Sequence, residues 1–191
     1  MKNIVSLFDG LSCLQIALNR QGTPYDNYYA SEVDKHCIAI TQKRYPNTIQ
    51  VGDICSLKES DFPSEIYLLV GGSPCQGFSF MGNQLNFTDN RSKLFFEYVR
   101  LWKELKPKYF ILENVKMRKD IQDAISAILG VQPIEINSAL FSGQNRRRLY
   151  WTNIPNIQNK MPPLNSISAL IKGISLLTDN SYEIATVRKG N

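Results

Sequence analysis

Short apolar runs alternate with amphipathic segments along the first 137 residues of the chain. The apolar runs predict strands at 3–8, 27–31, 48–51, 66–70, 109–113 and 132–137. Segments with apolar residues at helical spacing predict helices at 12–20, 34–45, 92–105 and 120–129. Strands that are apolar throughout are typical of parallel sheets covered on both faces. The pattern therefore predicts an α/β fold with a doubly wound, mostly parallel sheet.

The pattern changes after Pro155. Asn, Pro and Ser accumulate there, Pro162-Pro163 is typical of a linker, and one short helix is expected at 167–171. We therefore divide the chain into a first domain at 1–155 and a second segment at 156–191. That segment joins a linker to a truncated or rudimentary C-terminal region.

Length and charge narrow the class of protein. A chain of 191 residues suits one domain with a substantial core. No apolar run approaches the roughly 20 residues that span a bilayer, and the N-terminus resembles no secretory signal, so we expect a soluble, intracellular protein without a membrane partner. Residues 1–100 hold 9 Lys and Arg against 10 Asp and Glu, whereas residues 101–191 hold 13 against 7. The basic half suits a polyanion, although ordinary solubilising charge explains it equally well.

The supply of metal-binding side chains is small. The four cysteines show no C-x-x-C spacing, and His36 is the single histidine. We therefore expect no metal site and no Ser-His-Asp triad.

Acidic residues follow the first three predicted strands. The turn Phe8-Asp9-Gly10 follows the first, Glu32 and Val33 follow the second, and Asp53 and Ile54 follow the third. A carboxylate at the end of the second strand suits ribose hydroxyls. The turn lacks G-x-G-x-x-G, the glycine-rich motif whose backbone binds the pyrophosphate of a dinucleotide. These residues therefore favour S-adenosylmethionine over NAD, with a nicotinamide-dependent enzyme as an alternative.

A cysteine follows the predicted strand at 66–70. The strand ends at Gly71-Gly72, and Cys75 then lies on a loop braced by Pro74. A thiol just beyond the carboxyl end of a parallel strand is well placed for a nucleophile. A small apolar cysteine that merely ends a strand is the alternative. Glu113, at the end of the next strand, makes a catalytic pair the better interpretation.

Several motifs together resemble the DNA cytosine-5 methyltransferases, in family order over residues 3–155. They are Pro74-Cys75-Gln76, Glu113-Asn114-Val115 and Gln144-Asn145-Arg146-Arg147-Arg148. The segments Ser6–Gly10 and Ala30–Val33 especially resemble the eukaryotic de novo branch and its phage and bacterial relatives. The resemblance implies the S-adenosylmethionine-dependent methyltransferase fold. It also implies methyl transfer to carbon 5 of cytosine in double-stranded DNA, through a cysteine adduct and base flipping, with S-adenosylhomocysteine as product.

The resemblance assigns roles to individual residues. The catalytic residues are Cys75, Glu113, Arg146 and Arg148. The cofactor-binding residues are Phe8, Asp9, Gly10, Glu32, Val33, Asp53, Ile54, Gly72 and Pro74. The substrate-binding residues are Ser73, Gln76, Asn114 and Gln144.

The chain departs from the family after the arginine element. Family members continue into a target-recognition region and a returning C-terminal motif, whereas 36 residues follow Pro155 here. We therefore expect a fragment, or a split enzyme completed by a second chain or a homo-oligomer; a minimal enzyme is the alternative. A tRNA cytosine-5 methyltransferase and a catalytically silent partner of an active subunit are further alternatives. The expected location is the cytoplasm of a bacterial or phage-infected cell, or the nucleus in a eukaryote.

Overall fold

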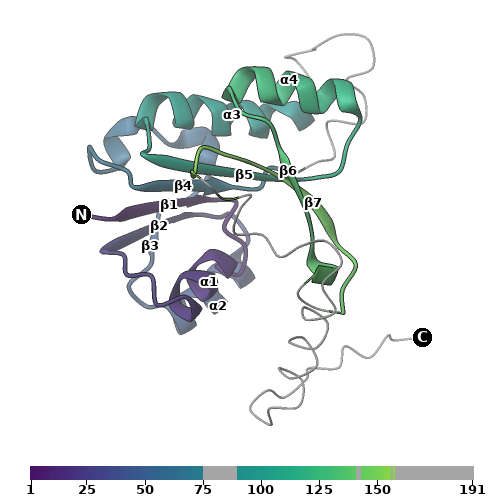
Figure 1. Cartoon of the computed structure of the whole chain (residues 1–191). Helices are drawn as coiled ribbons and strands as arrows, with labels where there is room; N and C mark the ends of the chain where they lie inside the picture. The colour runs from purple at the N-terminus through teal and green to yellow at the C-terminus, as the bar shows by residue number, and fades with distance from the viewer. Residues whose placement is uncertain (75–89, 141–142, 156, 158–191) are drawn as a thin grey trace. The chain divides into compact units, whose positions relative to one another are not determined.

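The computed structural model describes residues 1–74, 90–140, 143–155 and 157 (Figure 1). The predictions for Cys75, Gln76 and the helix at 167–171 lie outside these residues. The chain divides into two compact units. The first comprises 1–135 and 148–155, and the second comprises 136–147 and 156–191.

The elements follow the predicted alternation. The strands are β1 (Asn3–Leu7), β2 (Asn27–Ser31), β3 (Ile49–Gln50), β4 (Leu68–Gly71), β5 (Tyr109–Val115), β6 (Ile134–Asn137) and β7 (Arg147–Thr152). The α-helices are α1 (Cys13–Arg20), α2 (Lys35–Arg44), α3 (Asn90–Leu105) and α4 (Lys119–Leu129). The described residues also form the short 3₁₀ helices η1 (Ile54–Ser56), η2 (Glu59–Asp61) and η4 (Ser138–Leu140).

The sheet is mostly parallel, as predicted. Its strand order is β3-β2-β1-β4-β5-β7-β6. The pairs β1–β2, β1–β4, β2–β3 and β4–β5 are parallel, whereas β5–β7 is antiparallel. The order runs outward from β1 in one direction and from β4 in the other. Ligands of doubly wound sheets bind beyond the carboxyl ends of the strands at such a switch point.

The two faces of the sheet are buried by different helices. Figure 1 shows α1 and α2 on one face and α3 and α4 on the other. Successive β1 side chains point to opposite faces, so Val5 joins the core that contains Phe95 and Ile125, whereas Ile4 joins the core beside Leu14. Burial on both faces explains why these strands are apolar throughout. Within the described ranges, no helix is both long and apolar enough to cross a membrane.

Local chemistry fixes the ends of two helices. Asp34 is the N-cap of α2, because its carboxylate accepts hydrogen bonds from the backbone N–H groups of His36 (2.7 Å) and Cys37 (3.2 Å). Helix α4 ends at Gly130, which has a φ of 72°. Glycine adopts this left-handed conformation without a side-chain clash.

One strand of the sheet, β7, was not predicted from the sequence pattern. Residues 147–152 form β7, where only a basic element was expected. Its burial alternates, with Leu149 and Trp151 inside the core, and the Trp151 indole N–H donates to Ser126 Oγ at 2.9 Å. This period-two pattern is short and follows three arginines, so the basic run obscured it.

Candidate functional site

The turn after β1 has an unusual backbone. Phe8, Gly10 and Ser12 have φ values of 58°, 56° and 55°, in the left-handed region. The intervening Asp9 N–H donates to Ser31 O at 3.1 Å, and Ser12 N–H donates to Asp9 O at 3.0 Å. These bonds fold the turn against the end of β2.

The Asp9 side chain is held inside this turn. One carboxylate oxygen accepts a hydrogen bond from the Tyr28 hydroxyl at 2.7 Å, and the other accepts from the Ser12 hydroxyl. Burial and the nearby Asp9 charge raise the pKa of Tyr28, so this phenol stays protonated and donates. Asp9 therefore stabilises the turn through its side chain.

Glu32 joins the end of β2 to the same turn. Its carboxylate accepts hydrogen bonds from the backbone N–H groups of Gly10 (2.7 Å), Val33 (2.7 Å) and Asp34 (2.9 Å). Three donors orient one partly exposed carboxylate beside the glycine turn. The adjacent Val33 side chain is 68% exposed, so an apolar surface lies next to an acidic one.

The end of β3 lies beside the end of β2. The Ser31 hydroxyl donates to Gly52 O at 2.7 Å. The exposed Asp53 carboxylate accepts from Cys55 N–H at 2.9 Å and caps η1, whereas the Ile54 side chain is buried in the core. The hydrogen bonds thus bring the predicted cofactor residues of β1, β2 and β3 to one edge.

The exits of β4 and β5 are joined by a buried amide. Asn114 is 1% exposed, and its Nδ2 donates to Ser73 O at 3.3 Å and Ser73 Oγ at 3.4 Å. Its Oδ1 accepts from Val115 N–H at 2.8 Å. Asn114 therefore fixes the first residues of the loop that leads through the exposed Pro74 toward Cys75.

Glu113 lies between a glycine and an arginine. Arg148 Nε donates to Glu113 Oε1 at 2.7 Å, and the side chains are 18% and 32% exposed. Val115 pairs with Arg148 across β5 and β7, so Arg148 is a diagonal neighbour of Glu113 on the same face. A β-carbon added at Gly72 would lie 2.8 Å from Glu113 Oε2. Glycine at 72 therefore leaves the space that this carboxylate occupies.

The second unit holds the remaining predicted residues, Gln144 and Arg146. The Asn137 side chain accepts hydrogen bonds at Oδ1 from Arg146 N–H and Ala139 N–H, each at 3.1 Å. The Ser138 hydroxyl donates to Gln144 O at 2.6 Å. The end of β6 therefore fixes the backbone of the segment that carries both residues.

Sequence reasoning missed the residues that support the site. Tyr28 and Ser12 hold Asp9, and Asn137 holds the arginine segment. Polar residues at turns directly after a strand were the available signal for Ser12 and Asn137. No local pattern distinguishes Tyr28 from an ordinary core tyrosine. In the part of the chain that the structure describes, no group of three or more His, Cys, Asp or Glu side chains could hold a metal ion.

Comparison with known proteins gives the family. Residues 2–126 match the model of the C-5 cytosine-specific DNA methylases. The orphan methyltransferase M.SPRI of Bacillus phage SPR is 36% identical over 164 residues, covering 79% of this chain and 37% of the relative. The type II methyltransferase M1.ScrFI of Lactococcus lactis subsp. cremoris is 36% identical over 200 residues, covering 95% of this chain and 51% of the relative.

Solved structures agree on the fold. The Dnmt2 methyltransferase of S. pombe superposes with a TM-score of 0.66 at 18% identity, covering 99% of this chain and 59% of that one. The methyltransferase fold predicted from the sequence is therefore confirmed. The chain spans about half or less of the length of the curated relatives described above. With the family model matching about two thirds of the residues, the chain belongs to the C-5 cytosine-specific DNA methylases.

Proposed function

We propose that this chain transfers a methyl group from S-adenosylmethionine to carbon 5 of cytosine in double-stranded DNA. The observation that carries the proposal is the Glu113–Arg148 ion pair beside Gly72, at the strand exit that leads to Cys75. A nucleophile and an oriented carboxylate at neighbouring strand ends are what addition to a pyrimidine ring requires. The matching family model is that of the C-5 cytosine-specific DNA methylases, and the relatives are named methyltransferases, which favours DNA over RNA and an enzyme over a silent partner.

The cofactor residues fit a nucleoside with a charged amino-acid tail. Glu32 offers an oriented carboxylate for ribose hydroxyls, and exposed Asp53 offers one for an amine. The backbone of the Phe8-Asp9-Gly10 turn, Val33 and the Gly72–Pro74 segment complete the proposed contacts. When bound, S-adenosylmethionine supplies an electrophilic methyl group on a sulfonium.

The protein's own residues prepare the cytosine. The Cys75 thiolate adds to carbon 6, and the ring electrons move to carbon 5, which becomes nucleophilic. After methylation, a base removes the carbon 5 proton; the carbon 6–sulfur bond then breaks and returns the electron pair to Cys75. A cytosine ring that is stacked and paired inside the duplex is not accessible to Cys75. The target nucleotide therefore rotates out of the duplex, at a cost of a few kcal/mol.

Glu113 selects the base. Its carboxyl group shares a proton with N3 and accepts a hydrogen bond from the exocyclic amine of cytosine, while Arg148 holds Oε1 in place. Thymine and uracil carry a donor at N3 and a carbonyl at position 4, so they do not match this pattern. The guanidinium groups of Arg146 and Arg148 bind the base carbonyl and a nearby phosphate, because their planar set of N–H donors matches such oxygen acceptors. Gln76 and Gln144 complete the substrate contacts, whereas the buried Ser73 and Asn114 hold the strand exits in place.

We further propose that a second chain or a second copy supplies sequence recognition. The phage and bacterial relatives support a bacterial cytoplasmic role, in restriction-modification or in phage self-protection.

A trapping experiment tests the chemistry. Fluorine at carbon 5 cannot leave as a cation, so duplex DNA containing 5-fluorocytosine should hold the enzyme covalently in the presence of S-adenosylmethionine. Intact-mass analysis should find the protein–DNA adduct with wild-type protein and none with Cys75→Ala.

Cys55→Ala is the matched control. Partial desolvation and the adjacent Asp53 carboxylate raise the pKa of the Cys55 thiol, which makes it a poor nucleophile. This variant should form the adduct as the wild type does. An adduct that survives in Cys75→Ala contradicts the assigned nucleophile.

A further inference from the structure

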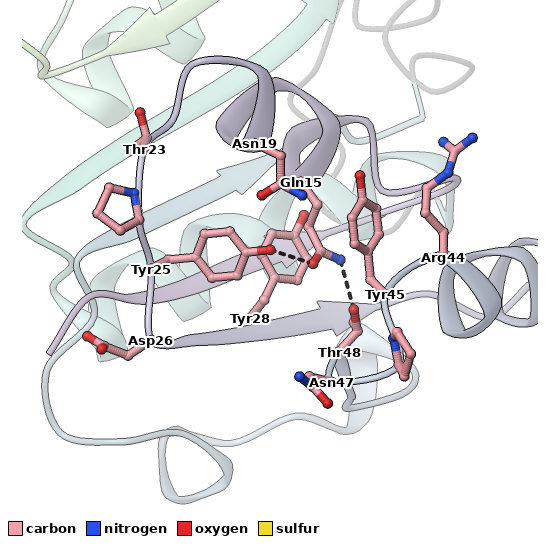
Figure 2. Close-up of a pocket in the computed structure, with 12 residues that line it drawn as sticks. Gln15, Asn19, Thr23, Tyr25, Asp26, Tyr28, Arg44, Tyr45, Asn47 and Thr48 are labelled. Atoms are coloured by element: carbon pink, nitrogen blue, oxygen red, sulfur yellow. Dashed lines mark hydrogen bonds between the residues drawn. The ribbon is translucent and has the colours of Figure 1, made fainter.

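A buried glutamine lies behind the cofactor turn. Gln15, on α1, is 2% exposed. Its Nε2 donates to Thr48 Oγ1 at 2.8 Å and to Ser12 Oγ at 3.2 Å, and its Oε1 accepts from the Tyr25 hydroxyl at 2.9 Å. Figure 2 shows the amide between the tyrosine hydroxyl and Thr48. The amide therefore uses donors and an acceptor in three directions.

The hydrogen bonds continue from Gln15 to Asp9. Ser12 Oγ accepts from Gln15 and from the Thr41 hydroxyl (3.3 Å), and it donates to the Asp9 carboxylate. The other Asp9 oxygen accepts from Tyr28. A continuous polar network thus reaches from α1 to the residue at the centre of the turn.

This network acts on a strained backbone. Phe8 and Ser12 are not glycine, yet both have a positive φ, which costs about 1–3 kcal/mol each and persists only where surrounding structure enforces it. Ser12 precedes α1, but its hydroxyl makes no cap bond to the helix. The hydroxyl is directed instead to Asp9, so the network and not the helix holds it.

Gln15 lies beside a pocket of about 390 Å³ that is also lined by Tyr25, Tyr28, Tyr45 and Thr48 (Figure 2), yet its side chain is almost fully covered. Because a buried amide that loses its partners is left unsatisfied, these hydrogen bonds strongly favour the observed position of the amide.

We propose that Gln15 is a positioning residue for cofactor binding: it holds Ser12, and through Ser12 it holds Asp9 and the backbone of the Phe8–Gly10 turn. The inference rests on the proposed function, since it takes the turn as the cofactor site. It adds a residue that lies behind the turn and does not contact the ligand.

Calorimetric titration with S-adenosylhomocysteine tests this without requiring turnover. Gln15→Met keeps the length of the side chain and removes every hydrogen bond, so its Kd should rise about tenfold, the effect of losing one well-oriented bond. The matched control is Ser126→Ala. Ser126 lies on α4, on the other face of the sheet, and this change removes the buried hydrogen bond that its hydroxyl accepts from Trp151. Its melting temperature should fall, whereas its Kd should stay at the wild-type value.

Two further measurements separate positioning from loss of stability. The Gly10 amide resonance should shift in ligand-free Gln15→Met and stay unchanged in Ser126→Ala. Tyr25→Phe removes only the outermost bond to Gln15 and should raise the Kd by about two- to threefold, less than Gln15→Met. Equal Kd values for wild type and Gln15→Met overturn the inference alone. A wild-type chain that does not bind S-adenosylhomocysteine overturns both the inference and the proposed function.

Discussion

Arg148 Nε lies 2.7 Å from Glu113 Oε1, and this ion pair connects the antiparallel strand β7 to the end of the parallel strand β5. Both side chains are more than half buried, so solvent screens the pair less than it screens a surface pair. The guanidinium contact holds one oxygen of the carboxylate in place. Glu113 is thereby oriented before any base arrives.

Arg148→Met should weaken base recognition more than it weakens the fold. The change leaves a partly buried carboxylate without its guanidinium, so the free energy of unfolding should fall by about 1–2 kcal/mol. The initial rate of adduct formation on 5-fluorocytosine DNA should fall at least tenfold, because Glu113 loses its fixed orientation. Urea unfolding and the adduct assay measure the two effects separately.

The matched control is Arg118→Met. Arg118 pairs with Asp120 at 2.7 Å, but both side chains are more than half exposed. Exposed pairs contribute about 0–1 kcal/mol, so stability and adduct rate should stay close to wild type. An Arg148→Met protein with the wild-type adduct rate would show that Glu113 needs no orientation by this arginine.

Gly72→Ala should disturb the same carboxylate from the other side. The added β-carbon would lie 2.8 Å from Glu113 Oε2, closer than real contacts allow, so the Glu113 side chain must shift. We expect adduct formation to slow by about tenfold and the unfolding free energy to fall by about 1–3 kcal/mol. Gly143→Ala is the control, since nothing lies within 4 Å of a β-carbon there. If both variants react equally fast, contact between Gly72 and Glu113 is not needed for the chemistry.

The cap of α2 should make stability depend on pH. Hydrogen bonds from Cys37 N–H and His36 N–H lower the pKa of Asp34, so the ionised carboxylate stabilises the folded state. This stabilisation is complete above the unfolded pKa of about 4 and is lost as pH falls through the lower folded pKa. Wild type should therefore melt above Asp34→Asn at pH 7, and the difference should vanish in acid. A gap of constant size down to pH 2 would exclude the carboxylate charge as its source.

The fold was predictable from the sequence where local and tertiary signals agree. Strands β1, β2, β4 and β5 are apolar because both faces are covered, and Asp34 marks the start of α2 through its side-chain chemistry. Strand β7 was not predictable from the arginine run. It is a strand because Trp151 and Leu149 fill the core beside β5, which is a tertiary cause.

The site was predictable only in part, for a similar reason. The acidic residues and glycines stand directly after strands, so topology brings them to one edge. The residues that hold these side chains in place lie in other parts of the chain. Tyr28 points inward from the middle of β2, and Gln15 lies within α1, so their contacts with this edge depend on packing between elements. No spacing along the chain encodes such contacts.

The last prediction concerns Asn114, an uncharged residue whose side chain links the ends of β4 and β5. Asn114→Ala removes the hydrogen bonds to Ser73 and leaves Val115 N–H without its side-chain acceptor. Loss of a buried bond with an orphaned donor costs about 1–3 kcal/mol of unfolding free energy. Because Ser73 begins the loop that leads to Cys75, adduct formation should fall further than stability explains.

The control for this prediction is Asn153→Ala, because the Asn153 side chain follows β7 and binds the backbone at the opposite end of β5. Asn153 accepts from Phe110 N–H at 2.9 Å and donates to Lys108 O at 3.0 Å, so its removal also breaks side-chain bonds to the backbone around β5. It should destabilise the fold while reacting at the wild-type rate under conditions where both variants are folded. Equal rates for the two variants would mean that Asn114 stabilises β5 and does nothing to position the Cys75 loop. A selective loss in Asn114→Ala would tie the position of that loop to one buried amide.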